Sequence, residues 1–224
     1  MFSAHDGALM PAPFPALPDP DLADFEERFS RRRMDFLRRA QETRAAALAE
    51  GLPARGLDAA LKNIEAHEGS LWLAVEDGAV LVPVWNNGPD AARFTGSFRL
   101  PAAEGITGLV FTSGLAMCES EVCFHQRQNR ALDRALGVLT WAMLAVPLRF
   151  AGEVRGVVTA VRLIRLDALP GLREAPRSRA DLPPGHALPE SFSLAHLAAM
   201  ETAAQVLGRL LDHRLSAWAL GWED

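Results

Sequence analysis

The most regular pattern in the chain is a pair of apolar runs within residues 141–164, WAMLAVPLRFAGEVRGVVTAVRLI. The first run, residues 143–150, ends at an Ala-Gly turn signal at 151–152, and the second, residues 154–164, is rich in β-branched side chains. This pattern predicts a long antiparallel β-hairpin. Two strands this apolar are unstable alone in water, so we expect neighbouring strands and a covering layer around them.

Shorter runs before this hairpin predict the rest of a sheet. Residues 70–76 alternate between apolar and polar positions, an Asp-Gly pair at 77–78 is a strong hairpin-turn signal, and residues 79–85 read as the returning strand. Residues 94–100 and 116–119 predict two further short strands. Together with the long hairpin, these segments predict a central antiparallel sheet.

Two long helices are predicted toward the ends of the chain. Residues 21–50 carry aromatic side chains at a mostly heptad-like spacing, and a last helix begins at a Ser193 cap. The last helix is apolar over so broad a face that we expect it to contact both its own sheet and a second body, either the first helix or another subunit. The predicted dimer interface consists of Phe25, Phe29, Phe36, Leu197, Leu207, Leu211 and Leu215.

Shorter helices are predicted between these elements. The first long helix should end at the Gly-Leu-Pro sequence at 51–53, and residues 57–67 predict a second helix. In EGITGLVFTSG, residues 104–114, Thr107 can cap a short helix that Gly114 ends. A further helix is predicted around residues 129–136.

Proline-rich segments divide the chain. Residues 1–20 contain five prolines and predict an extended arm or a disordered tail, because proline is excluded from helix interiors. Residues 166–191 contain five more and predict a long surface loop. The predicted organisation is an arm at 1–20, a helix at 21–55, and a domain at 56–220 that includes this loop.

The composition narrows the classes of function. A chain of 224 residues that is 49% hydrophobic can form one globular domain with a substantial core. Its formal net charge of −5 argues against non-specific nucleic-acid binding. Two cysteines do not make a disulfide framework, and the N-terminus lacks the basic region of a signal peptide. Because no apolar run approaches about 18 residues, we expect a cytoplasmic protein with no membrane span.

The order of the predicted elements, with EGITGLVFTSG at 104–114 and MLAVPLRFAGEVRGVVTAV at 143–161, resembles a GAF domain. The resemblance covers about residues 56–164 and 192–215. It implies an α+β fold, in which a central antiparallel sheet of five or six strands has helices packed on one face and a ligand pocket on the other, with long N- and C-terminal helices. Similar domains sense small molecules and often dimerise through their terminal helices.

The sequence departs from three ligand classes of similar domains. Asn129-Arg130 is not followed by the Phe-x-x-x-Asp-Glu signature of cyclic-nucleotide binders. The bilin-attaching Cys-His pair is replaced by Cys123-Phe124-His125, and the chain has no tyrosine. A free methionine sulfoxide reductase of this fold would use several pocket cysteines, and this chain has two. The sequence therefore predicts no particular cofactor, and the cofactor is unknown.

Candidate pocket residues follow from the predicted elements. The exposed amides at a helix start near Thr107 would favour a carboxylate or phosphate, and Arg99 could add a bidentate contact. Several aromatic side chains could line an apolar pocket, although each could equally belong to the core. The predicted pocket consists of Trp85, Arg99, Thr107, Gly108, Phe111, Cys118, Glu119, Phe124, Trp141 and Met143.

The soft metal ligands gather in one segment. Cys118, Cys123 and His125 lie within eight residues and could form a metal or haem site, a reversible disulfide, or a peroxide-sensing thiol. The alternative is two inert reduced thiols.

Three functional hypotheses remain. The first is a non-catalytic sensory or regulatory module that binds a small molecule or a partner signalling protein and signals through a helical dimer interface. The second is a thiol-based redox sensor or reductase that uses Cys118 and Cys123. The third is a scaffold without a pocket that acts through residues 21–50 and 166–191. Because no Ser-His-Asp arrangement, P-loop or Rossmann fingerprint is present, enzyme activity is not the favoured hypothesis.

Overall fold

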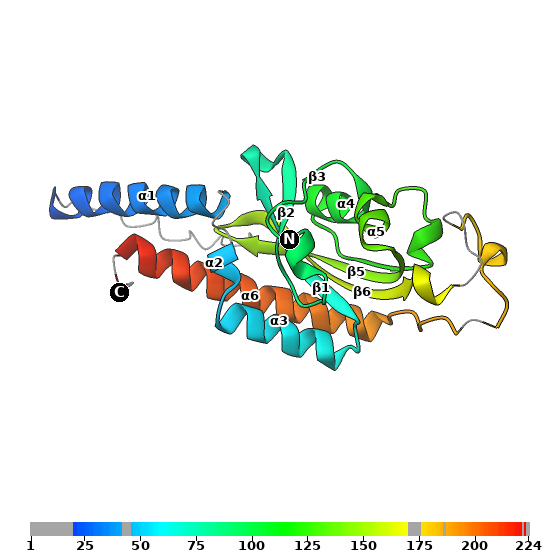
Figure 1. Ribbon diagram of the computed structural model, residues 1–224. Coiled ribbons are helices and arrows are strands. Elements are labelled where there is room, and N and C mark those ends of the chain that lie inside the picture. The colour runs from blue at the N-terminus through cyan, green and yellow to red at the C-terminus, as the bar shows by residue number, and fades with distance from the viewer. Residues whose placement is uncertain (1–19, 42–45, 170–175, 186, 221, 223–224) are drawn as a thin grey trace, which may run out of the picture.

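The computed structural model describes residues 20–41, 46–169, 176–185, 187–220 and 222. Its centre is a six-stranded antiparallel sheet in the order β3-β2-β1-β6-β5-β4 (Figure 1). The strands are β1 (Glu68–Val75), β2 (Val80–Asn86), β3 (Leu100–Pro101), β4 (Met117–Ser120), β5 (Val138–Phe150) and β6 (Glu153–Arg165). The predicted α+β fold with a central antiparallel sheet is confirmed.

The predicted long hairpin is formed by β5 and β6. Each strand has 13 residues, which extends the hairpin beyond both predicted ends. The turn lies at Ala151 and Gly152, both of which have positive φ angles, 53° and 85°. The Ala151 N–H donates to Asp212 Oδ1 at 2.6 Å, and the Arg33 guanidinium donates to the Ala151 carbonyl oxygen at 3.4 Å. Both terminal helices therefore contact the tip of the hairpin.

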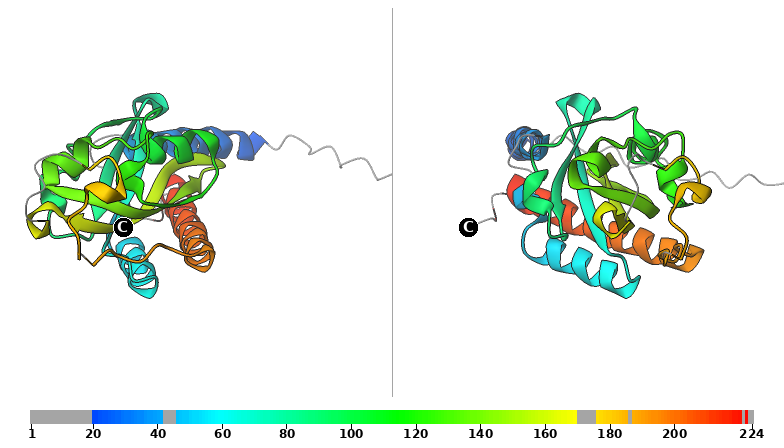
Figure 2. Two further views of the ribbon diagram at one scale, coloured as in Figure 1. Left: turned by 90° about the vertical axis from the view of Figure 1, so that its right-hand side faces the viewer. Right: turned by 45° about the vertical axis from the view of Figure 1, so that its right-hand side comes forward.

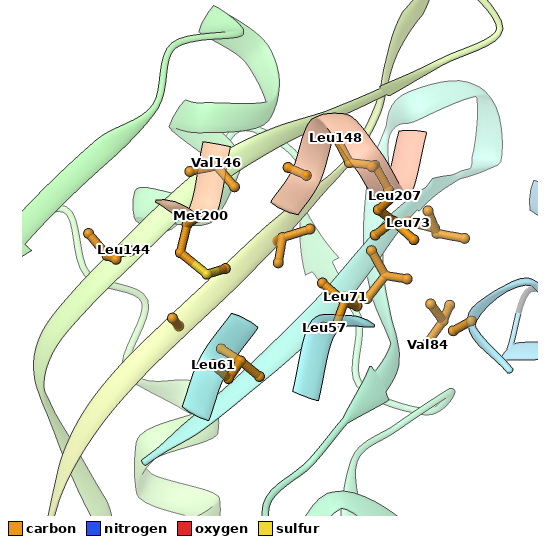
Figure 3. Close-up of a cluster of buried hydrophobic side chains, with 14 of the residues drawn as sticks. Leu57, Leu61, Leu71, Leu73, Val84, Leu144, Val146, Leu148, Met200 and Leu207 are labelled. Atoms are coloured by element: carbon orange, nitrogen blue, oxygen red, sulfur yellow. The ribbon is translucent and has the colours of Figure 1, made fainter. Parts of the chain in front are cut away.

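One face of the sheet is covered by α3 (Leu52–Asn63) and α6 (Leu194–Leu220), as Figure 2 shows. Leucine side chains of α3, β1 and β5 meet Met200 and Leu207 of α6 in the main core (Figure 3). α6 approaches β5 so closely at Gly208 that an added β-carbon would lie 2.1 Å from the Arg149 carbonyl oxygen. The Ser193 hydroxyl accepts the His196 N–H at 3.2 Å, so the predicted cap of this helix is confirmed.

The N-terminal region is divided into α1 (Pro20–Gln41) and α2 (Ala46–Ala49) rather than forming one helix over 21–50. Gly51, with a φ of 72°, separates α2 from α3, and α3 begins at Leu52 instead of residue 57. α1 packs along α6, and both helices extend from the same end of the domain (Figure 1). The proline-rich arm predicted at 1–20 lies outside the described residues, apart from Pro20 at the start of α1.

The opposite face of the sheet carries α4 (Gly105–Ser113), α5 (Ala131–Leu136) and the segment between β2 and β3 (Figure 2). The strand predicted over 94–100 is wrong for all but its last residue. Phe94 and Phe98 belong instead to a turn in which the Phe98 N–H donates to the Phe94 carbonyl oxygen at 2.9 Å. Local turn hydrogen bonds thus replace strand pairing here.

The cap predicted for the helix within 104–114 also differs in the structure. Glu104 occupies the N-cap position of α4, and Thr107 lies buried inside the first turn. Gly114 ends the helix in the left-handed conformation, with a φ of 67°, as predicted.

The described parts of the 166–191 segment pack against the edge of the sheet. The Arg179 guanidinium lies 5.9 Å from the centre of the Trp141 ring and 3.5 Å from the Glu121 carboxylate. Residues 170–175 and 186 fall outside the described residues. Within the described ranges, no helix has both the length and the apolar character needed to cross a membrane.

Candidate functional site

A cavity of about 90 Å³ lies on the sheet face opposite α3 and α6. It has room for several water molecules or a small solute. Its roof is made by α4, α5 and the segment before β3, and its floor by β1, β2, β5 and β6. The side chains that line it include Glu68, Ser70, Trp72, Asn86, Phe94, Phe98, Ile106, Thr107, Gln128, Asn129, Leu132, Asp133, Thr140, Met143, Thr159, Val161 and Leu163.

The floor follows from the alternation of side chains along a strand. In β1, Glu68, Ser70 and Trp72 face the cavity, whereas Leu71 and Leu73 face the helix layer. Polar residues at alternate positions of a largely buried strand are therefore the sequence signal of this site.

A β-bulge sets the contribution of β5. Its register with β6 shifts between Thr140 and Ala142, so Thr140 and Met143 face the cavity while Trp141 and Ala142 both face the helix layer. Trp141 then packs edge-to-face with Phe124, at 6.0 Å between ring centres and 88° between ring planes. The bulge thus turns the predicted pocket residue Trp141 toward the main core, where Phe124 packs against it.

Asp133 of α5 anchors the roof to the floor. One carboxylate oxygen accepts the Thr140 N–H at 3.0 Å, and the other accepts the Thr140 hydroxyl at 2.9 Å. Burial raises the pKa of Asp133 above its ordinary value, and the hydrogen bonds from Thr140 oppose that rise. The two hydrogen bonds from Thr140 therefore hold the carboxyl group of Asp133 in place beside the cavity.

A hydrogen-bonded row crosses the floor. The Trp72 indole N–H donates to Thr159 Oγ1 at 3.1 Å, and the Asn86 amide donates to Ser70 Oγ at 3.0 Å. These contacts fix the orientation of the polar groups under the cavity, because each hydrogen bond constrains two side chains.

Glu68 lies at the end of this row. Burial raises the pKa of its carboxyl group, and the nearby Asp90 carboxylate raises it further, whereas a hydrogen bond with Asn86 opposes the rise. The carboxyl group lies so close to Gly88 that an added β-carbon would be 2.2 Å from it.

The structure places Thr107 and Met143 of the predicted pocket in the cavity lining. Arg99 is exposed, forms an ion pair with Glu76 and does not line the cavity. Gly108 is buried in α4 against the carbonyl group of Ala102.

The other predicted pocket residues lie elsewhere. Phe111 packs on the cavity side of the sheet without lining the cavity, and Trp85 and Phe124 pack against the main core. Glu119 lies on the edge strand β4, opposite Met143 of β5.

The predicted soft-ligand cluster is not assembled as a metal site. No group of three or more His, Cys, Asp or Glu side chains among the described residues could hold a metal ion. Cys118 and Cys123 are free thiols, and neither they nor His125 line the cavity. Burial raises the pKa of the Cys123 thiol to about 11 and also raises that of Cys118, whose thiol contacts the Phe192 carbonyl oxygen at 3.6 Å.

An antiparallel sheet with long helices on one face and a small cavity under short helices on the other defines a class of α+β domains, the GAF-like domains. The family model for the GAF domain matches residues 54–183, more than half of the chain. The chain therefore belongs to the GAF domain family.

Solved structures agree with this fold. A GAF domain of an Acinetobacter phosphoenolpyruvate-protein phosphotransferase matches with a TM-score of 0.53 at 19% identity, covering 85% of this chain and 98% of that one. A free methionine-R-sulfoxide reductase of Neisseria meningitidis, solved with its substrate, matches with a TM-score of 0.51 at 17% identity, covering 91% and 96%. At these identities the likeness shows the fold alone. No curated protein matches the sequence.

Proposed function

We propose that this GAF domain is a sensory or regulatory module that binds a small molecule in the cavity between the sheet and the α4–α5 roof. The observation that carries the proposal is the lining itself, which combines apolar walls with polar groups that hydrogen bonds orient at Ser70, Asp133 and Thr159. Ligand pockets characteristically combine apolar surface with a few placed polar groups.

The cavity supports this function over a scaffold without a pocket. The thiol-based alternative has less support, because Cys118 and Cys123 lie outside the lining and both have raised pKa values. A thiol acts as a nucleophile in its thiolate form, which a raised pKa disfavours. We therefore propose a non-catalytic role.

We further propose that the module signals as a homodimer or to a partner protein through α1 and the end of α6. Phe25, Phe29 and Phe36 lie on one face of α1, since their spacings are four and seven residues. Phe36 is 5% exposed where α1 meets the domain, whereas Phe25 is 44% exposed farther along. The same apolar stripe is thus covered at one end and bare at the other.

This arrangement changes the predicted interface. Leu207, Leu211 and Leu215 are buried within their own chain, so they are not available to a second copy. Leu197 is half-buried near the start of α6. The interface that we propose is therefore centred on Phe25 and Phe29.

A thermal screen of small metabolites tests ligand binding. A ligand at about 100 times its Kd stabilises the folded state by about 2.7 kcal/mol, so we expect Tm to rise by about 5–10 °C with at least one compound. A Val161→Trp variant should lose that rise, because the larger side chain fills the cavity. The matched control is Val206→Trp, at an exposed position of α6. Compounds that stabilise both variants equally would contradict binding at this cavity.

A further inference from the structure

The cavity lining is acidic. Glu68 and Asp133 both line it, and no lysine, arginine or histidine does so among the residues that the structure describes. Arg165 and Arg130 are near enough to lower the pKa of Glu68 and Asp133, respectively, but neither arginine lines the cavity. In the described ranges neither acid takes part in an ion pair. Partly buried carboxylates without a paired cation are costly, and a positively charged guest would offset that cost.

Thr107 provides an independent observation on the roof. It is 6% exposed and lines the cavity, yet its hydroxyl has no hydrogen-bond partner among the described residues. The hydroxyl is not one of the fully buried polar atoms without a partner, so its oxygen is accessible and can contact a guest in the cavity. A hydroxyl oxygen can accept a hydrogen bond from an ammonium group.

The aromatic and aliphatic walls also suit a small cation with an apolar body. Trp72 and Phe98 meet edge-to-face, with ring centres 6.2 Å apart, and both line the cavity. Aromatic ring faces attract cations. Leu132 and Val161 supply aliphatic surface beside them.

The start of α4 is the one feature that would favour an anion, because a helix N-terminus carries a partial positive charge. Glu104 occupies the N-cap position there, and its carboxylate accepts a hydrogen bond from the Asn129 amide at 2.8 Å. The negative charge of Glu104 therefore already offsets the helix dipole. The acidic lining is left as the dominant electrostatic feature of the cavity.

We infer that the cavity takes a small organic cation, a protonated primary amine with a short apolar body, whose ammonium group is held by Glu68 or Asp133 and by the Thr107 hydroxyl. This inference rests on the proposed small-molecule function and names the class of ligand.

The test compares three probes of one size and different charge: butylamine, butan-1-ol and butanoate. Each is titrated into the full chain labelled with ¹⁵N at pH 7.5 and constant ionic strength. The reporter is the Trp72 indole N–H, assigned with a Trp72→Phe variant, because this group lies in the floor. The Trp141 indole, on the other side of the sheet, is the internal control.

We expect butylamine to shift the Trp72 signal with a Kd at least tenfold below those of the other two probes, since hydrogen bonds to charged groups are the stronger class. Glu68→Gln or Thr107→Val should weaken butylamine binding severalfold. Glu201→Gln, at an exposed position of α6, should not change it.

Equal or tighter binding of butan-1-ol or butanoate would overturn the cation inference while leaving the small-molecule function intact. Unchanged butylamine binding in both the Glu68→Gln and Thr107→Val variants would also overturn it. If no probe moves the Trp72 signal, the inference fails, and the metabolite screen then decides separately whether the proposed function fails with it.

Discussion

Arg162 is a buried arginine that joins three parts of the chain. It is 4% exposed, and its guanidinium donates to the carbonyl oxygens of Ile64, Glu65 and Glu190 at 3.1, 3.2 and 3.0 Å. It also lies 4.6 Å from the centre of the Phe192 ring. Ile64 is the C-cap of α3, where the helix dipole favours a positive charge. One side chain of β6 therefore holds both the end of α3 and the segment that leads into α6.

Replacing Arg162 with methionine should lower the free energy of unfolding by about 2–4 kcal/mol, because three carbonyl groups lose their donor. Urea unfolding followed by circular dichroism measures the change. Arg134→Met, at an exposed position of α5, is the matched control and should stay within about 0.5 kcal/mol of the wild type. A loss at Arg162 no larger than that of the control would show that these contacts contribute little.

The two thiols should react slowly in the folded protein. With a pKa of about 11, Cys123 at pH 8 has a thiolate fraction about a hundredfold lower than a thiol of pKa 9. We expect iodoacetamide to label Cys123 at least a hundredfold more slowly in the folded than in the denatured chain, with Cys118 also slowed but less so. Mass spectrometry of timed samples measures both rates. Labelling of the folded chain at the denatured rate would revive the thiol-based hypothesis.

At the scale of elements, α6 docks on β5 through a glycine. The contact between Gly208 and the Arg149 carbonyl group leaves no room for a β-carbon, so Gly208→Ala must push the helix from the strand. We expect a loss of about 1–3 kcal/mol in the free energy of unfolding, which is typical of overpacking.

Gly56 offers the opposite case within α3. Nothing lies within 4 Å of a β-carbon built there, so Gly56→Ala should stabilise the protein by about 0.5–1 kcal/mol through helix propensity alone. Thermal unfolding of the Gly208→Ala and Gly56→Ala variants measures both changes in the free energy of unfolding. The explanation fails if the two substitutions change the free energy of unfolding in the same direction.

The elements themselves could largely be predicted from the sequence. The β5–β6 hairpin and the Asp77-Gly78 turn follow from strand patterning and local turn chemistry, which are written in adjacent residues. The predicted start of α3, residue 57, is too late because Pro53 is interpreted there as the end of the preceding helix. Proline is also common in the first turn of a helix, which is its place in α3.

The site was harder to predict, because the cavity is made by residues distant in sequence. Trp141 is predicted as one of several aromatics that could line the pocket or belong to the core, and the bulge in β5 turns it toward the main core. Phe94 and Phe98 fall in a segment that the sequence predicts as a strand, and Asp133 is not among the predicted pocket residues, although all three line the cavity. A bulge and a roof over a sheet depend on long-range packing, which a local pattern does not encode.

At the scale of the whole molecule, the bare end of the α1 stripe should decide the oligomeric state. Phe25 and Phe29 stack with ring centres 6.0 Å apart in the first half of α1, before Phe36 and Leu37, which belong to the main core. Phe25→Glu with Phe29→Glu should shift a dimer toward monomer by at least tenfold in Kd, because two apolar groups in an interface become charged. Sedimentation velocity over a concentration series measures the shift.

Ser30→Glu, on an exposed part of the same helix, is the control for added charge and should leave the dimer unchanged. Wild-type protein that stays monomeric at all concentrations would contradict the homodimer and leave the partner protein as the remaining occupant of this surface.

The β5–β6 hairpin gives the molecule a mechanical property. Thr140 and Leu163 lie under the cavity at one end, and Ala151 is held by Asp212 of α6 and Arg33 of α1 at the other. The paired strands of 13 residues span about 40 Å between these two ends, and over that length a tilt of about 3° at the base corresponds to a tip displacement of about 2 Å. Under the proposed small-molecule function, an adjustment of the strands around a guest would therefore displace Ala151 and, through Asp212 and Arg33, the two helices that contact it.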